Sequence, residues 1–162
     1  MTPNPIILPG CSEDELSAAL IDEEKKMREA DTARVISDSI KKVVADKAEF
    51  ALLFGSIVSD RFSSESDIDI GIYCKGGEIS FEKKLDITLE LESATNREID
   101  LILLNASDLI ITMQILANGK LIINHDPGLF LLFKAQKISE YIDFKRDRKI
   151  VEDHLLTRRI YA

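Results

Sequence analysis

The chain has 162 residues, of which 45 % are hydrophobic and 31 % charged, and its formal net charge is −8. These values predict a soluble globular protein with a core of its own, and they argue against a broad nucleic-acid-binding surface, which requires a basic face. No apolar run approaches the ~20 residues that span a bilayer, and residues 1–10 lack the regions of a signal peptide. Because Cys11 and Cys74 suggest neither a disulfide framework nor a metal-ligand spacing, we expect a reduced, cytoplasmic setting.

The first part of the chain predicts an irregular arm followed by helix. Residues 1–11 contain three prolines and one glycine, a composition typical of irregular structure. Ser12 and Glu15 have the spacing of a capping box. Two apolar stripes then predict two helices, or one long helix broken near residues 31–32. We assign residues 1–47 to an N-terminal arm and helical extension and residues 48–162 to the main domain.

Strands and helices are predicted to alternate in the main domain, which indicates an α/β fold. Short apolar runs predict strands over residues 50–54, 67–74, 99–104 and 121–123. The predicted architecture is a short mixed sheet with helices packed on it and with flanking helices at both ends of the chain.

Three further helices follow from periodic apolar spacing and from residues that suit helix ends. They are predicted over residues 80–94, 105–118 and 127–158. Ser80 suits an N-cap, Gly119 a C-cap and Pro127 the first helical position. In the first of these helices, Phe81 and the apolar residues four and eight positions later share one face.

Five residues in or beside the predicted strands form a polar pattern. Gly55 and Ser56 end the first strand, Asp67 and Asp69 belong to the second, and Asp100 belongs to the third. Alternation along a strand places Asp67 and Asp69 on one face and the intervening isoleucines on the other. A lone Asp-x-Asp or Gly-Ser pair is ordinary turn chemistry, but three carboxylates in apolar strands are costly without a ligand. Together they favour a functional site.

The same five residues suit a nucleoside triphosphate and its metal ions. Three carboxylates can hold two Mg²⁺ ions about 3.5–4 Å apart, so that the ions clamp both the attacking and the leaving oxygen. A glycine lets the backbone approach phosphates closely, and a serine offers a hydroxyl and an amide. We therefore predict Asp67, Asp69 and Asp100 as metal ligands, and Gly55 and Ser56 as triphosphate-binding residues.

Other chemistry-bearing residues give weaker signals. His125 and His154 are isolated in the sequence and suit surface or capping roles. Cys74, at a strand end, suits packing better than nucleophilic attack. Arg61 and Lys75 lie near the site in sequence and are compatible with either phosphate contact or a solvated surface.

Three segments resemble the catalytic motifs of the polymerase-beta-like nucleotidyltransferase superfamily: Leu53-Phe54-Gly55-Ser56, Ser66-Asp67-Ile68-Asp69-Ile70 and Ile99-Asp100-Leu101. The chain is more closely similar to the minimal nucleotidyltransferases that serve as antitoxins beside HEPN ribonuclease toxins (the MntA-like antitoxins). That looser likeness continues through residues 106–107, 114–120 and 135–141, and the whole resemblance covers about residues 48–158.

The resemblance implies the fold of that superfamily, ATP as substrate and two Mg²⁺ ions held by Asp67, Asp69 and Asp100. It also implies that Asp100 helps to deprotonate the attacking hydroxyl, while Gly55 and Ser56 hold the triphosphate. Many members carry Arg-Gly or Lys-Gly shortly after the Gly-Ser pair, whereas this chain has Ser59-Asp60.

The function implied by the resemblance is transfer of AMP from ATP to a tyrosine of a cognate HEPN toxin. Two alternatives stay open: an adenylyltransferase acting on an aminoglycoside or similar polyol, which an acidic surface would suit, and an antitoxin that acts by binding alone. No membrane partner is expected. The predicted docking surface is the terminal helix, which carries a set of basic and aromatic residues: Lys134, Lys137, Tyr141, Phe144 and Lys145.

Overall fold

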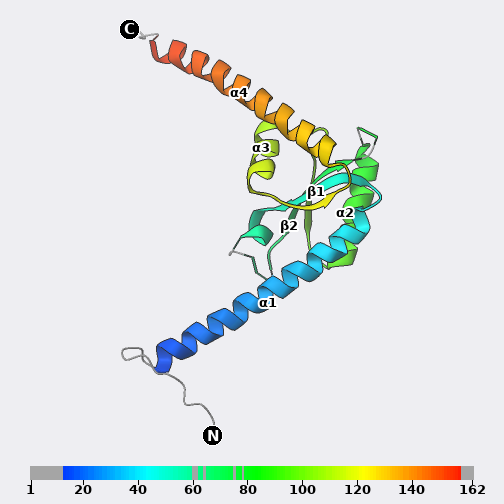
Figure 1. The fold of residues 1–162 in the computed structure, drawn as a ribbon, viewed down its shortest axis with the longest axis vertical. Coiled ribbons are helices and arrows are strands. Elements are labelled where there is room, and N and C mark those ends of the chain that lie inside the picture. The colour runs from blue at the N-terminus through cyan, green and yellow to red at the C-terminus, as the bar shows by residue number, and fades with distance from the viewer. Residues whose placement is uncertain (1–12, 60–61, 64, 75, 78, 158–162) are drawn as a thin grey trace.

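A computed structural model describes residues 13–59, 62–63, 65–74, 76–77 and 79–157. The elements in chain order are α1 (Glu13–Val44), β1 (Ala48–Phe54), the 3-10 helix η1 (Gly55–Val58), β2 (Ile68–Cys74), α2 (Phe81–Thr95), β3 (Ile99–Leu103), α3 (Leu109–Asn118), β4 (Lys120–Asn124) and α4 (Pro127–Thr157). The sheet lies at the centre, and the start of α1 and the end of α4 extend well beyond it (Figure 1). The predicted α/β fold is confirmed.

The four strands form one mixed sheet in the order β3-β2-β1-β4. Strand β1 runs antiparallel to both β2 and β4, whereas β2 and β3 are parallel. A parallel pair needs a crossover connection, and α2 provides it. In the resulting register Asp69 pairs with Phe54 on one side and with Asp100 on the other.

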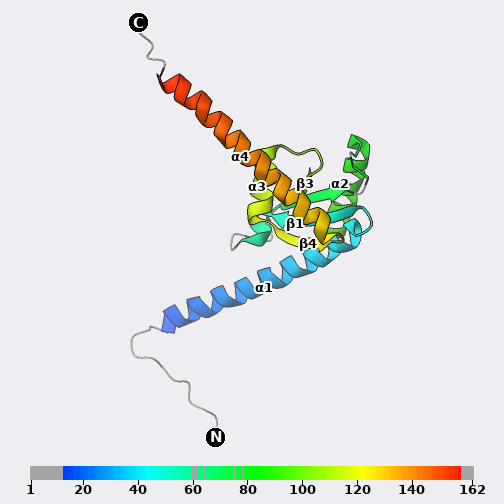
Figure 2. The same ribbon diagram turned by 45° about the horizontal axis from the view of Figure 1, so that its top comes forward.

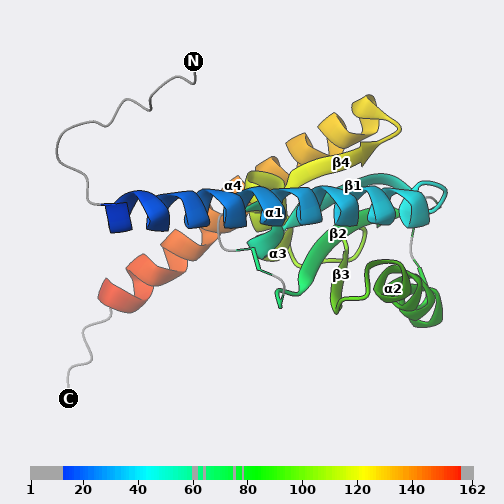
Figure 3. The same cartoon turned by 90° about the horizontal axis from the view of Figure 1, so that it is seen from below.

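One face of the sheet packs against α1 and α2 (Figure 3). Ile68, Ile70 and Ile72 alternate onto this face and are fully buried there. The two helices add a second set of buried aliphatic residues: Ile36, Ile40, Val44, Ile87 and Leu91. The last turns of α1 are therefore part of the core.

The opposite face packs against α3 and α4 (Figure 2). Its centre is an aromatic cluster in which the Phe50 ring centroid lies 4.8 Å from Tyr73, 5.0 Å from Phe130 and 5.4 Å from Phe133. Aromatic pairs at these separations add to the free energy of burial. Because Asp69 alternates with the buried isoleucines of β2, its carboxylate lies on this face of the sheet.

Helix α1 is continuous from Glu13 to Val44, so the predicted break near residues 31–32 is wrong. The Thr32 hydroxyl donates to the Arg28 carbonyl at 2.8 Å and stays within the helical pattern. Ion pairs one turn apart, Asp22 with Lys26 and Glu24 with Arg28, further favour an unbroken helix. Ser12, of the expected capping box, lies outside the described residues. No helix in the described part of the chain is both long and apolar enough to cross a membrane.

Helix α2 begins as predicted, but a different face of it from the expected one packs against the core. Ser80 caps it by accepting from the Lys83 amide at 3.3 Å. Its core contacts come from Ile87 and Leu91. The expected apolar face is exposed to solvent, with 78 % of Phe81 accessible and Leu85 and Leu89 also exposed.

Helix α3 starts at Leu109, four residues later than residue 105, because Asp108 is the N-cap. Asn105 instead holds the end of β2, accepting from the Cys74 amide at 2.7 Å. Gly119 ends the helix as predicted, but its φ of −76° is extended rather than left-handed. A glycine is needed there because a Cβ would lie 2.5 Å from the Ile115 carbonyl oxygen.

Candidate active site

The Gly55-Ser56 turn lies directly against the Asp69 carboxylate. Strand β1 ends at Phe54, which is the register partner of Asp69, so the next residue passes close to that side chain. Gly55 has a φ of +69°, and a Cβ built there would be 1.9 Å from Asp69 Oδ2. Glycine is therefore required twice, for the left-handed conformation and for the close approach.

Ser56 links the same turn to the start of the Asp-x-Asp segment. Its hydroxyl donates to the Asp67 carbonyl at 3.5 Å, and its own carbonyl accepts from the Ser59 amide at 3.0 Å. A hydrogen bond of 3.5 Å is long and weak. The Ser56 hydroxyl is thus placed by the backbone of η1 while remaining able to turn toward a ligand.

The three predicted carboxylates gather at one end of β2 and β3. Asp69 and Asp100 are register partners in the parallel pair, so their side chains lie on the same face of neighbouring strands, and such strands are about 4.8 Å apart. Asp67 precedes β2 by one residue and is exposed, as is Asp100, while Asp69 is half-buried. All five residues predicted for the site are therefore brought together.

The closeness of the three carboxylates affects the pKa of the central one, Asp69. Burial raises the pKa of Asp69 above its ordinary 3.8, and the negative charges of Asp100 and Asp67 raise it further. Each of these causes disfavours the ionised form. A cation placed among the three carboxylates would remove the repulsion.

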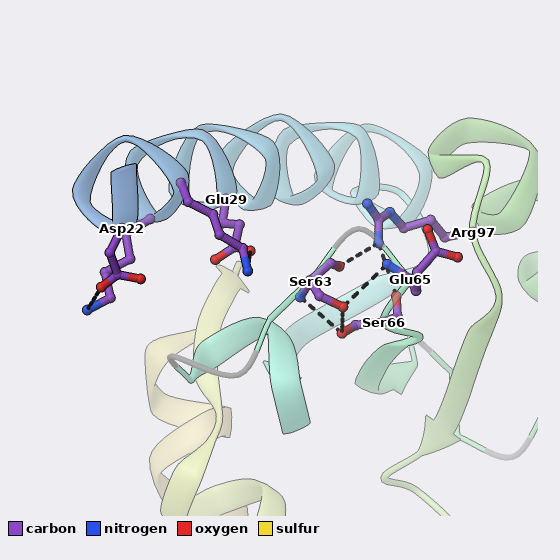
Figure 4. A network of polar contacts seen from close by, with 8 residues as sticks. Asp22, Glu29, Ser63, Glu65, Ser66 and Arg97 are labelled. Carbon is purple, nitrogen blue, oxygen red and sulfur yellow. Dashed lines mark hydrogen bonds and ion pairs between the residues drawn. The ribbon is translucent and has the colours of Figure 1, made fainter. Parts of the chain in front are cut away.

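A hydrogen-bonded clamp that the sequence did not reveal holds the loop before Asp67 (Figure 4). One guanidinium nitrogen of Arg97 donates to the carbonyls of both Ser63 and Ser66, each at 3.1 Å. The guanidinium also lies 5.2 Å from the ring centroid of Phe62, which is buried. The available signal was a single cation three residues before Asp100 in an otherwise apolar and acidic segment.

An open cleft of about 620 Å³ runs beside the carboxylates. Asp67 and Asp100 line it together with Arg97 and two residues from the end of α2 and the turn after it, Glu92 and Asn96. The cleft offers room for a substrate next to the carboxylates.

The donor set fits Mg²⁺, which prefers carboxylate oxygens and retains water and phosphate ligands. Gly55 fits as well, because the absence of a Cβ lets the Asp69 carboxylate lie directly against the turn. Within the described residues, no group of three or more carboxylate, histidine or cysteine side chains is arranged closely enough to hold a metal ion without rearrangement. Asp67, Asp69 and Asp100 would hold the metal.

The weaker candidates lie away from this site or have structural partners. Burial raises the pKa of the Cys74 thiol to about 11, which suits packing rather than nucleophilic attack. The His125 ring bonds through Nε2 to the Ala45 carbonyl at 2.9 Å. Asp60, Arg61 and Lys75 lie outside the described residues, and nothing is described of the His154 side chain.

A family model described as "Polymerase beta, Nucleotidyltransferase" matches residues 38–128, more than half of the chain. The chain belongs to this nucleotidyltransferase family. The matched segment of the nucleotidyltransferase runs from the buried end of α1 to the start of α4 and contains all five predicted site residues. A sequence comparison with curated proteins found no match.

Several solved structures with the same fold are of toxin–antitoxin complexes. The nucleotidyltransferase matches a chain of a toxin–antitoxin with AMP-PNP (TM-score 0.65, 23 % identity, 75 % of this chain and 98 % of that chain). It also matches the toxin–antitoxin MntA-HepT (TM-score 0.62, 22 % identity, 76 % and 99 %). A third match is a tri-AMPylated Shewanella oneidensis HEPN toxin in complex with MNT antitoxin (TM-score 0.62, 23 % identity, 77 % and 99 %). At these identities the likeness establishes the fold.

Proposed function

We propose that this nucleotidyltransferase transfers AMP from ATP to a tyrosine hydroxyl of a HEPN ribonuclease toxin and thereby acts as its antitoxin. The observation that carries the proposal is the register pairing of Asp69 with Asp100, with Asp67 beside them and Gly55 against Asp69. This arrangement suits phosphoryl-group chemistry, in which positioning and charge stabilisation do most of the work.

Each residue of the site has a distinct task in the proposed reaction. Gly55 and Ser56 bind the triphosphate through the backbone and hydroxyl of the turn. Asp67, Asp69 and Asp100 would hold Mg²⁺, which would supply positive charge to the reacting phosphate oxygens. Asp100, which lies on the edge strand of the sheet, accepts the proton of the acceptor hydroxyl. A bond forms between the tyrosine oxygen and the α-phosphorus, the bond from that phosphorus to the bridging oxygen of the β-phosphate breaks, and pyrophosphate leaves.

The fold neighbours support this choice of substrate and acceptor. One of them was crystallised with AMP-PNP, and another contains an AMPylated HEPN toxin in complex with its MNT antitoxin. The acceptor in the proposal is a protein side chain, and the open cleft beside Asp67 and Asp100 is a suitable place for it to enter.

Helix α4 is our proposed docking surface for the toxin, and two residues of the expected set, Phe144 and Lys145, are exposed on it. Lys137 pairs with Glu140 at 2.8 Å and lies over the buried ring of Phe133, so it faces the protein. The helix also exposes apolar residues at helical spacing: Leu131, Ala135, Ile138 and Ile142. A partner helix could pack along such a stripe.

The decisive experiment incubates the protein with ATP, Mg²⁺ and the product of the neighbouring gene, which the proposal requires to be a HEPN ribonuclease. We expect mass spectrometry to show the toxin with one or more AMP groups on tyrosine and with its ribonuclease activity lost. The Asp100→Asn variant should still bind Mg-ATP through Asp67 and Asp69 but should transfer no AMP, because it has lost the proton acceptor.

The controls separate the three possible functions. A toxin that stays unmodified while an aminoglycoside is rapidly adenylylated would overturn the proposal in favour of a small-molecule transferase. A toxin that stays unmodified but is silenced equally by wild type and by Asp69→Asn would identify an antitoxin that acts by binding alone. If Asp100→Asn loses nucleotide binding and AMP transfer by the same factor, Asp100 has no separate role as the proton acceptor.

Ser56→Ala should reduce the efficiency of AMP transfer about ten- to a hundredfold, less than any of the aspartate changes. A hydrogen bond to a charged phosphate is worth about 1.5–3 kcal/mol, and each 1.36 kcal/mol corresponds to about tenfold in rate. The measurement is kcat/KM for ATP, with Ser93→Ala on the exposed surface of α2 as the matched control. Unchanged efficiency would mean that the backbone of the turn alone holds the phosphates.

A further inference from the structure

We infer that Arg97 is a positioning residue that fixes Asp67 in the metal-binding arrangement. This inference rests on the proposed function for the identity of the reaction, but the placement of Asp67 can be measured without any reaction. The clamp consists of Arg97, the Ser63 and Ser66 carbonyls that it binds, and the Phe62 ring beneath it.

The clamp acts on the residue immediately before Asp67. Arg97 binds the Ser66 carbonyl, which belongs to the peptide unit that joins Ser66 to Asp67, and it binds the Ser63 carbonyl three residues earlier. Side-chain bonds inside the loop add to this, because the Ser66 hydroxyl accepts from the Ser63 amide at 3.1 Å. The loop therefore enters β2 along a path defined by Arg97.

Arg97 is itself held from both sides along the chain. Asn96 ends α2 in a left-handed conformation with a φ of 53°, and its amide donates to the Glu92 carbonyl at 2.7 Å. On the other side, the Glu98 carbonyl accepts from the Ile68 amide at 3.0 Å. The guanidinium of Arg97 is confined further by the ring of Phe62, which is only 6 % exposed. The donor is thus ordered before any ligand binds.

Residues 97–100 link two of the proposed metal ligands, Asp67 and Asp100. Arg97 holds the loop that carries Asp67, and Asp100 follows three residues later on β3. Asp67 has no strand pairing of its own, since β2 begins at Ile68, whereas Asp69 and Asp100 are fixed by the sheet. Of the three carboxylates, Asp67 is therefore the one whose position depends most on the loop.

Some residues do not bind a metal themselves but orient its ligands. Removing such a residue lowers metal affinity by about 10- to 100-fold. We expect Arg97→Met, which keeps an apolar stem over Phe62 but has no donor, to weaken Mn²⁺ binding about tenfold as measured by electron paramagnetic resonance. Arg97→Lys, with one charged donor but no planar fork, should lose less. Hydrogen exchange of the amides of residues 65–68 should become faster in both variants.

The activity readout separates positioning from structural support. Arg97→Met should raise the Mg²⁺ concentration needed for half-maximal AMP transfer and should approach the wild-type kcat when Mg²⁺ is saturating. Asp67→Asn, which lacks the ligand itself, should not be rescued in this way. Arg28→Met, an exposed arginine on α1 that pairs with Glu24, is the matched control and should match wild type in every measurement.

The inference is overturned if Arg97→Met melts at a lower temperature but binds Mn²⁺ and exchanges its loop amides as wild type does. It is also overturned if saturating Mg²⁺ leaves kcat as low as in Asp67→Asn. A wild-type protein that binds Mn²⁺ but transfers no AMP to the toxin would refute the proposed function alone, because the Mn²⁺ and exchange measurements would still test the clamp. Failure of the wild type to bind Mn²⁺ would refute both.

Discussion

Replacing Asp69 by asparagine should abolish most AMP transfer while making the metal-free protein more stable. The substitution keeps the shape of the side chain but removes the charge at the centre of the three carboxylates. We expect transfer to fall about a thousandfold or more, which corresponds to roughly 4 kcal/mol of lost transition-state stabilisation. Asp67→Asn should have an effect of the same kind.

The stability effect follows from the direction of the pKa shift. Burial, Asp100 and Asp67 raise the pKa of Asp69 in the folded protein above its ordinary 3.8. The folded state therefore binds the proton more tightly than the unfolded state, and stability falls as pH rises from about that ordinary value through the raised pKa. Above this window the ionised Asp69 carboxylate is destabilising without metal, whereas the neutral amide of the Asp69→Asn variant avoids this cost.

Thermal unfolding at pH 7 in EDTA and in Mg²⁺ measures both parts of the expectation. Wild type should melt lower than Asp69→Asn in EDTA, and Mg²⁺ should stabilise wild type more than the variant. Asp86→Asn, at an exposed position on α2, should change neither melting nor transfer. Near wild-type transfer by Asp69→Asn or Asp67→Asn with Mg²⁺ present would refute the two-metal assignment.

Gly55→Ala should damage both the fold and the reaction, although it adds a single methyl group. The left-handed backbone conformation at this position costs an L-residue roughly 1–2 kcal/mol. In addition, the new Cβ would stand 1.9 Å from Asp69 Oδ2, so the carboxylate must move away from the turn. We expect a clear fall in the melting temperature and a loss of transfer of about a hundredfold or more, since the Gly55 turn and the Asp69 carboxylate are both displaced.

A control glycine on the same chain separates the two causes. Gly76 has a φ of +81°, and a Cβ there would meet nothing within 4 Å. Gly76→Ala should therefore show only the cost of the backbone conformation and should keep full activity. Adding Asp69→Ala to Gly55→Ala should restore much of the stability by removing the clash, a non-additive result typical of residues in contact. If the stability effects of the two substitutions simply add, the close approach of Gly55 to Asp69 is contradicted.

The sequence predicted which residues lie together because they interrupt apolar strands. A carboxylate in a strand of isoleucines and leucines stands out, and the period of two assigns Asp67 and Asp69 to the same face without further information. The register of β2 and β3 was not visible in the sequence. It depends on the α2 crossover and on packing across the sheet, yet it decides that Asp69 and Asp100 are direct neighbours.

Other features escaped prediction for identifiable physical reasons. The apolar stripe of Phe81, Leu85 and Leu89 resembles a core face, but packing against α1 and β3 selected Ile87 and Leu91 instead. The break expected in α1 was based on its two separate apolar stripes, but the helix continues between them, where the Thr32 hydroxyl bonds to the Arg28 carbonyl. The Arg97 clamp joins residues more than thirty positions apart, a distance over which spacing carries no signal.

The parallel pairing of β2 and β3 would also make the proposed metal a reporter of correct folding. The side chains of a strand alternate between faces, so a slip of β3 by one residue against β2 would turn Asp100 toward the α1 side and bring Ile99 or Leu101 to the position beside Asp69. Such a misfolded molecule would bury a charge among the aliphatic residues and would lack a ligand. If the proposed site holds magnesium, the ion would bind tightly only to the native register, and binding to the native state alone shifts the equilibrium toward it. Cellular magnesium would thereby act as a selective folding ligand, and a nascent chain would gain this selection only after residue 100 has emerged and paired.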